Sequence, residues 1–330
     1  MKILIAGGSG FLGSHFIRYM AKKYADYELY NLDRINFMDE FSAVKDFSIP
    51  ESYHFIEGDV RDNKIIETTA KDKDIIVNFA SINRDKETGL SGDFITTRML
   101  GTFNLLEATR KFGIKRFIQS SDYEVYGEAR SKENIGRPSI ESDPLFPTSP
   151  SGSAKAGADH LVNTYYIRFQ TPTVILRSAS NFGPYQDPLK MIPLFIIKAL
   201  EGKSIPIHGD GNYTRDWIYV KDQCEAFDKV LHAKGIDGQI YNVGAANERT
   251  VLQMTDLILT ILDRPRDLIE FVPDRAGREM RRAIDVTKIR EEIGWTAKTD
   301  FNKAIEETVN WYVENHWWWE RRLVKDAKSQ

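Results

Sequence analysis

The 330-residue chain is predicted to fold as a doubly wound α/β domain, a parallel sheet with helices on both faces, joined to a smaller α/β part. Short apolar runs alternate with amphipathic segments through its first half, which is typical of a parallel sheet covered on both sides. After Arg177 this alternation stops, and glycine, proline and aromatic residues gather on loops. We therefore divide the chain at this point, into residues 1–177 and 178–330, and expect segments near 212–243 to return to the first part.

The strands of the first part are expected at its short apolar runs, which read KILIA, YELYNL, YHFIEG, DIIVNFA, KRFIQSS and TPTVILR. Helical patterns separate these runs at residues 11–23, 93–112 and 152–169. The returning segment contains a further helix, YVKDQCEAFDKVL. Near the C-terminus the run WYVENHWWWERR mixes aromatic and charged residues. It is expected to pack as the end of an amphipathic helix, with membrane contact as the alternative.

Composition and charge argue against several classes of protein. The 45 basic and 48 acidic residues are mixed along the chain, so no basic stripe is present to bind nucleic acid. The single cysteine allows no internal disulfide framework, and the six histidines show no metal-ligand spacing. No apolar run approaches the ~20 residues of a membrane span, and the apolar stretch at the start is too short for a signal peptide. We expect a cytoplasmic protein without a metal, a nucleic-acid partner or a membrane partner.

A glycine-rich loop, GGSGFLG, follows the first strand and leads directly into a helix. Glycine is needed there because the turn requires unusual backbone angles and because the backbone must approach a pyrophosphate at the helix N-terminus. Asp33 ends the next strand about 20 residues later, where a carboxylate can bind the adenosine ribose. Together these features predict a dinucleotide site of the Rossmann type. The carboxylate would repel a 2'-phosphate, so NAD is favoured, although the adjacent Arg34 leaves NADP open.

Other cofactor contacts are expected at the ends of later strands. Asp59 and Val60, in EGDVRD, are suited to the adenine edge, with an ordinary turn as the alternative. The sequence NFAS ends the fourth strand on the same side of the sheet. The residues expected to bind the cofactor are Gly7, Gly10, Phe11, Leu12, Gly13, Asp33, Arg34, Asp59, Val60, Phe79, Ala80 and Ser81.

Over nearly its whole length the chain resembles the extended short-chain dehydrogenase/reductases, and among them the dTDP-glucose 4,6-dehydratases. The segments that carry the resemblance include GGSGFLGSH, GTFNLLEATRKFGIKRFIQSSDYEVYG, SNFGPYQDPLKMIPLF, GDGNYTRDWIYVKD, YNVGAANE and the ending TVNWYVENHWWW. The resemblance implies an NAD-bound homodimer that acts on a nucleoside-diphosphate hexose. In such enzymes hydride passes from the sugar C4 to NAD, water is lost across C5 and C6, and the hydride returns to C6. The implied dimer forms through the helices at residues 93–112 and 152–169.

The catalytic residues implied by the resemblance are partly changed. Lys155 matches the lysine that holds the nicotinamide ribose, but Ser151 stands where the tyrosine of a YxxxK pair belongs. A serine hydroxyl is far less acidic than a phenol, so the usual base for the 4-hydroxyl is missing. Glu124 keeps the place of the base that removes the C5 proton. Tyr123 replaces an aspartic acid and Asp122 a threonine. We expect Asp122 to accept the 4-hydroxyl proton and Tyr123 to protonate the leaving 6-hydroxyl.

The same resemblance implies a set of substrate contacts, with arginine forks suited to a diphosphate. A surface ion pair is the alternative for any one arginine, and packing is the alternative for the lone histidine. The expected substrate residues are Asn181, Lys190, His208, Arg215, Asn247 and Arg281, and the resemblance adds Thr97 to the cofactor set. Within the enzyme class, 4-epimerisation or simple C4 oxidation is the alternative to dehydration. Outside it, the alternative is a catalytically impaired homologue that binds nucleotide sugars.

Overall fold

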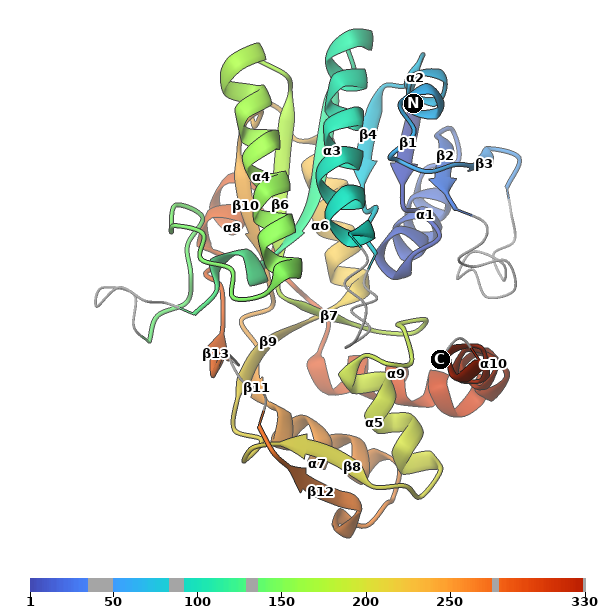
Figure 1. Cartoon of the computed structure of the whole chain (residues 1–330), viewed down its shortest axis with the longest axis vertical. Helices are drawn as coiled ribbons and strands as arrows, with labels where there is room; N and C mark the ends of the chain where they lie inside the picture. The colour runs from blue at the N-terminus through green and yellow to red at the C-terminus, as the bar shows by residue number, and fades with distance from the viewer. Residues whose placement is uncertain (35–49, 83–91, 129–135, 275–278, 329–330) are drawn as a thin grey trace.

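The computed structural model describes residues 1–34, 50–82, 92–128, 136–274 and 279–328 (Figure 1). Its centre is a seven-stranded sheet in the order β10-β6-β5-β4-β1-β2-β3, in which every neighbouring pair is parallel. The predicted doubly wound α/β fold is confirmed. The strands are β1 (Lys2–Ala6), β2 (Glu28–Asp33), β3 (Tyr53–Glu57), β4 (Ile75–Asn78), β5 (Arg116–Asp122), β6 (Thr173–Ser178) and β10 (Ile240–Val243).

Helices cover both faces of this sheet because its strands carry apolar side chains on both sides. In β1, Ile3 and Ile5 pack in one core cluster with side chains of α1 and α6, whereas Leu4 and Ala6 pack on the opposite face with α2, α3 and α4. Both faces are therefore dry, as parallel sheets require. The helices are α1 (Phe11–Lys23), α2 (Asn63–Ala70), α3 (Asp93–Phe112), α4 (Pro150–Phe169), α6 (Val220–His232) and α8 (Thr287–Ile293).

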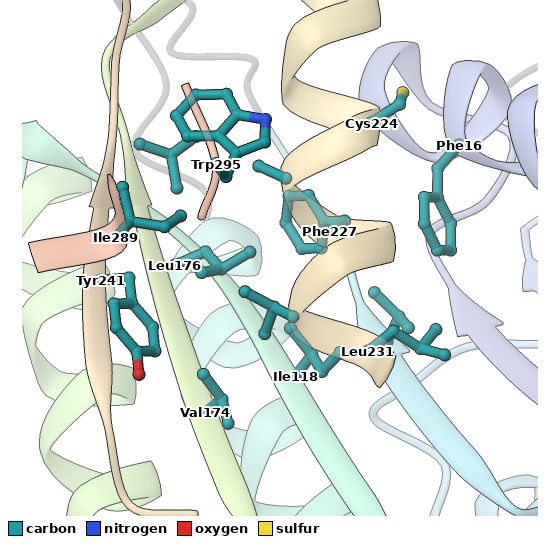
Figure 2. Packing of buried hydrophobic residues seen from close by; sticks show 14 of the residues in the cluster. Phe16, Ile118, Val174, Leu176, Cys224, Phe227, Leu231, Tyr241, Ile289 and Trp295 are labelled. Carbon is teal, nitrogen blue, oxygen red and sulfur yellow. The ribbon is translucent and has the colours of Figure 1, made fainter. Parts of the chain in front are cut away.

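Figure 2 shows the cluster on the α6 face. Phe227 and Leu231 of α6 lie over the strands, with Phe16 of α1 on one side and Trp295 on the other. All four side chains are buried. This layer holds α1, and with it the loop that precedes α1, against the carboxyl edge of the sheet.

The helix α4 begins two residues before the position expected from periodicity. Ser149 caps it by accepting a hydrogen bond from the backbone N–H of Gly152 at 2.9 Å, and Pro150 occupies the first turn. Both residues favour a helix start, since the proline needs no N–H partner there.

The smaller part lies beyond the carboxyl ends of the strands (Figure 1). One sheet of four strands contains β7 (Ser180–Phe182), β9 (Thr214–Tyr219), β11 (Glu248–Thr250) and β13 (Arg281–Arg282), and a second pairs β8 (Ile205–His208) with β12 (Ile269–Val272). The helices are α5 (Met191–Leu200), α7 (Val251–Ile261), α9 (Phe301–Glu314) and α10 (His316–Lys328), with a short 3-10 turn η3 (Arg266–Leu268). A second 3-10 turn, η2 (Tyr123–Tyr126), follows β5 in the larger part. Strand β9 runs directly into α6, so the chain returns here to the large sheet.

The aromatic run near the C-terminus spans two helices and is not the end of one. The break falls at Asn315, whose φ of −116° and ψ of 48° are not helical. The turn brings Trp318 and Trp319 into the core of the smaller part, and the indole N–H of Trp319 donates to the Tyr312 carbonyl at 2.9 Å. The described helices include none that is both long and apolar enough to span a bilayer.

Candidate active site

The glycine loop between β1 and α1 is held in a conformation that side chains would prevent. Gly7 has a φ of +77°, and a Cβ atom there would lie 2.6 Å from the backbone of Ala80. A Cβ on Gly13 would lie 2.4 Å from the Gly7 carbonyl oxygen. Gly10 precedes α1 and has no side chain to cap it. The N–H groups of the first helical turn are therefore open to an anion, so the loop fits a pyrophosphate.

Asp33 connects the end of β2 to this loop. Its carboxylate accepts hydrogen bonds from the backbone N–H groups of Ser9 at 2.8 Å and Arg34 at 2.7 Å. Burial raises the pKa of Asp33 above its usual value, and these two hydrogen bonds oppose that effect. The Arg34 side chain lies with its Nε 3.5 Å from Asp59, which also pairs with Arg61 at 2.7 Å. Asp59 thus holds two guanidinium groups at the cofactor side of the sheet.

The other residues expected at the cofactor lie around the same edge, with side chains in different environments. The Phe79 ring packs against the core, with its centroid 4.7 Å from that of Phe227, and its backbone borders Gly7 of the loop. Phe11 and Leu12 pack against the core of the smaller part, and Val60 is buried. In contrast, the buried Thr97 hydroxyl has no hydrogen-bond partner among the described residues.

Two carboxylates and a lysine meet where β5 ends. Asp122 caps the turn η2 by accepting the backbone N–H of Glu124 at 2.9 Å, and its other carboxylate oxygen contacts the Nζ of Lys155. Glu124 lies 3.8 Å from the same Nζ and accepts a hydrogen bond from the Ser149 hydroxyl at 2.5 Å. The three groups come from the last residue of β5, from η2 and from the second turn of α4.

Lys155 lies in a strongly positive neighbourhood. Burial is the main effect that lowers the pKa of Lys155 well below its usual value, and the charges of Arg98, Lys190 and Arg282 add to it. The charge of Asp159 acts in the opposite direction. A cluster of cations beside two carboxylates can bind an anionic ligand and keep a neighbouring carboxyl ionised.

Ser151 lies one helical turn before Lys155, on the same face of α4. Its hydroxyl accepts a hydrogen bond from the Nη1 of Arg98 at 2.6 Å. Arg98 is not among the site residues expected from the sequence. The sequence could have suggested Arg98, because it directly follows the expected cofactor residue Thr97 in α3.

Tyr123 lies in the core cluster on the α6 face of the sheet and is buried. Its hydroxyl hydrogen-bonds with the Ser180 hydroxyl at 2.5 Å, and the Arg282 guanidinium lies over its ring at 5.8 Å. Burial raises the pKa of Tyr123, so the phenol stays protonated. Ser180 and Arg282 were also not identified from the sequence.

Among the expected substrate residues, Asn181, Lys190 and Arg215 lie around this cluster. The Nδ2 of Asn181 donates to the Ser178 hydroxyl at 3.0 Å, while its buried Oδ1 has no partner in the described ranges. Lys190 precedes α5 and is exposed, yet close enough to influence Lys155. Arg215 donates to the backbone carbonyl of Glu279 at 3.1 Å.

The remaining expected substrate residues are engaged within the smaller part. Arg281 makes a two-pronged ion pair with Glu248 at 2.6 and 2.7 Å. The Nδ1 of His208 lies 3.0 Å from the Pro273 carbonyl oxygen. The backbone N–H of Asn247 donates to Asp216 at 2.8 Å. The Nη1 of Arg281 also donates to the backbone carbonyl of Gly136 at 2.7 Å, so a ligand would have to compete with both partners for this guanidinium.

Comparison with known proteins decides the class of enzyme. The family model described as GDP-mannose 4,6 dehydratase matches residues 4–308. The chain belongs to this family. It is therefore an enzyme of the nucleotide-sugar dehydratase and epimerase kind, which confirms the class expected from the sequence.

The similarity extends over the whole length of the relatives. The low-salt glycan biosynthesis protein Agl12 of Haloferax volcanii is 39% identical, covering 95% of this chain and 99% of that protein. The structure of dTDP-glucose 4,6-dehydratase from Bacillus anthracis in complex with NAD is 38% identical, with a TM-score of 0.88 over 97% of this chain and 99% of that one. The dTDP-glucose 4,6-dehydratase DesIV of Streptomyces venezuelae, solved with NAD and TYD bound, is 33% identical with a TM-score of 0.91 over the same shares of the two chains.

The part of this dehydratase-family protein that the structure describes contains no group of three or more His, Cys, Asp or Glu side chains arranged to hold a metal ion. The roles of Asp122, Tyr123 and Ser151 remain predictions from the sequence.

Proposed function

We propose that this protein is an NAD-dependent 4,6-dehydratase of a nucleoside-diphosphate hexose, a lyase in which the acid and base groups are rearranged. The observation that carries the proposal is the meeting of Asp122 and Glu124 with Lys155 at the end of β5. A dehydratase needs a proton acceptor for the 4-hydroxyl and a second one for C5, and two carboxylates on one turn supply both.

The cofactor is held by the loop from Gly7 to Gly13 at the start of α1 and by the strand ends beside it. Gly7 and Gly13 leave room for the pyrophosphate, and Asp33 faces the adenosine ribose and disfavours a 2'-phosphate. The contact between Arg34 and Asp59 further favours NAD over NADP, because it draws the guanidinium towards a carboxylate. Bound there, NAD would supply the hydride acceptor for the sugar C4 and the hydride donor for C6.

The protein's own groups move the protons. Asp122 accepts the proton of the 4-hydroxyl, and its contact with the Nζ of Lys155 favours the ionised form of the carboxyl. Glu124, oriented by the Ser149 hydroxyl, removes the C5 proton and returns a proton to C5 at the end. The Tyr123 phenol, protonated because of its burial, gives its proton to the leaving 6-hydroxyl through its contact with Ser180.

The nucleotide sugar is bound mainly by residues 178–330, and the cofactor by residues 1–177 together with α6 and β10. Lys190, Arg215 and Arg281 supply positive charge for the diphosphate. The buried Oδ1 of Asn181, which has no hydrogen-bond partner among the described residues, can accept from a sugar hydroxyl or an N–H group. His208 and Asn247 line the side expected for the base. We place the enzyme in the cytoplasm, which fits its single buried cysteine.

The test is to incubate the purified protein with a panel of nucleotide hexoses and NAD and to analyse the products by mass spectrometry. Loss of one water from a substrate supports the proposal. An isomer of unchanged mass would instead identify a 4-epimerase. Binding of a nucleotide hexose without any product would identify a catalytically inactive homologue.

A further inference from the structure

Arg98 is a buried cation at the site with no role in the proposed proton transfers. Only 4% of the residue is exposed. Its Nη1 donates to the Ser151 hydroxyl at 2.6 Å and to the Ser151 carbonyl oxygen at 3.0 Å, and its Nη2 donates to the Ser81 hydroxyl at 2.9 Å. Burying a guanidinium is unfavourable unless its hydrogen bonds are satisfied. The two serines orient it between the cofactor edge of the sheet and the start of α4.

The contact determines what the Ser151 hydroxyl can do. A guanidinium has donors and no acceptor, so Ser151 Oγ must be the acceptor in this hydrogen bond. The hydroxyl keeps its own hydrogen for another group, and no acceptor takes it among the residues that the structure describes. Ser151 is therefore a donor at a position one helical turn from Lys155, which itself contacts Asp122. A neighbouring cation also makes the hydroxyl a stronger hydrogen-bond donor.

We propose that Arg98 and Ser151 act as one unit, in which Arg98 positions and polarises the Ser151 hydroxyl so that it donates a hydrogen bond to the sugar O4. This inference rests on the proposed dehydration. When Glu124 removes the C5 proton of the 4-keto sugar, the electron pair of the C–H bond forms a C4–C5 double bond and negative charge develops on O4. Ser151 stabilises that charge without losing its proton. The charge then returns to re-form the C4 carbonyl as a C5–C6 double bond forms and the 6-hydroxyl leaves as water with a proton from Tyr123.

The unit can be tested without turnover, through the acidity of a thiol placed at Ser151. In a Ser151→Cys variant the only other thiol is Cys224, which is buried and whose pKa is raised by that burial. The thiolate absorbance in an ultraviolet pH titration then reports the introduced thiol, which Lys155, Asp122 and Glu124 also influence. We expect its pKa to be at least about one unit lower with Arg98 present than in the Arg98→Met, Ser151→Cys double variant, a tenfold change in the acid dissociation constant. Equal pKa values in the two proteins would overturn the proposal.

The catalytic consequence can be isolated from hydride transfer by supplying the 4-keto-6-deoxy nucleotide sugar in D2O and following exchange of its C5 proton by NMR. Arg98→Met and Ser151→Ala should each slow exchange by about 10²-fold, the scale of a lost oxyanion donor. The double variant should be no slower than either single variant, because the two residues act together. The Arg98→Lys variant keeps the charge but loses the forked geometry of the guanidinium. Its exchange rate should lie between those of the unchanged protein and Arg98→Met.

Arg110→Met is the matched control, since Arg110 lies in the same helix and pairs with Glu107 on the surface. It should exchange the C5 proton at the rate of the unchanged protein. Normal exchange in Arg98→Met, with a circular dichroism spectrum like that of the unchanged protein, would overturn the inference and leave the proposed function intact. Absence of exchange in the unchanged protein would overturn the proposed function, and the thiol titration would then decide the coupling of Arg98 to Ser151.

Discussion

Gly7 shows how a single residue makes the cofactor loop possible. It combines a left-handed φ of +77° with a backbone neighbour that leaves no room for a Cβ atom. We expect Gly7→Ala to abolish NAD binding in calorimetry, because the loop must shift away from Ala80. Gly113→Ala is the matched control, since Gly113 also has a positive φ of 64° but nothing lies within 4 Å of its Cβ position. This control should cost about 1 kcal/mol of stability and bind NAD normally. NAD binding by Gly7→Ala with unchanged affinity would contradict the assignment of the loop.

Asp122 has two roles that one substitution separates. It caps η2, and in the proposed mechanism it is the base for the 4-hydroxyl. Asparagine caps as well as aspartate but cannot accept the proton, so Asp122→Asn should lower the rate of product formation by about 10²-fold or more. Asp62→Asn, at the equivalent cap of α2, should leave the rate unchanged. Full activity of Asp122→Asn would show that the carboxylate is only a cap.

At the scale of elements, Asp216 of β9 connects this strand to the segment that follows β10. This carboxylate accepts the backbone N–H of Asn247 at 2.8 Å. Burial raises the pKa of Asp216 to about 6, although backbone hydrogen bonds oppose the shift. An unfolded aspartate has a pKa of about 3.9. The folded protein therefore binds this proton more tightly than the unfolded chain. The resulting stability is fully present below pH ~4 and is lost as the pH rises through ~6.

The prediction concerns how the difference in unfolding free energy between the unchanged protein and Asp216→Asn varies with pH. From pH ~3 to ~7 the unfolding free energy of the unchanged protein should fall relative to that of Asp216→Asn by about 3 kcal/mol, the equivalent of two pKa units. Chemical denaturation at several pH values measures it. Asp267→Asn, an exposed aspartate in η3, is the control and should show no such trend. A difference in unfolding free energy that does not vary with pH would contradict the raised pKa of the buried Asp216.

At the scale of the whole molecule, α3 and α4 lie side by side on one face of the sheet (Figure 1). Large apolar side chains remain exposed on them, including Leu100 at 43%, Phe103 at 42% and Ile167 at 66%. Monomeric proteins rarely leave such side chains clustered on adjacent helices. We propose that they bury one another in a two-fold dimer, as the sequence led us to expect.

A charge in this surface should separate the subunits. Phe103→Glu is expected to be a monomer at micromolar concentration in light scattering, since a carboxylate buried in the dimer would lack a partner. Phe271→Glu is the control, because Phe271 is 59% exposed on β12 in the smaller part and should leave the dimer intact. A monomer in the unchanged protein would refute the proposed interface.

The local order of the fold is readable in the sequence. Each predicted apolar run of the first part is a strand of the parallel sheet, because strands buried on both faces need continuous apolar sequence. The helices at residues 11–23 and 93–112 begin and end where their periodicity predicts. The glycine loop and Asp33 were also visible, since a tight turn and a strand-end carboxylate are properties of short segments.

The partners of the site residues were decided by tertiary packing. The guanidinium of Arg98 reaches Ser151 because α3 packs against α4. The two residues are 53 positions apart, and no sequence spacing predicts a contact at that separation. Packing likewise buries Tyr123 against Ser180 and brings Arg281 into an ion pair with Glu248. The sequence by itself determined the order of strands and helices, because backbone periodicity and turn geometry are local. Only the tertiary structure decided which polar groups meet, because a buried donor takes whichever acceptor the packed helices and strands bring within about 3 Å.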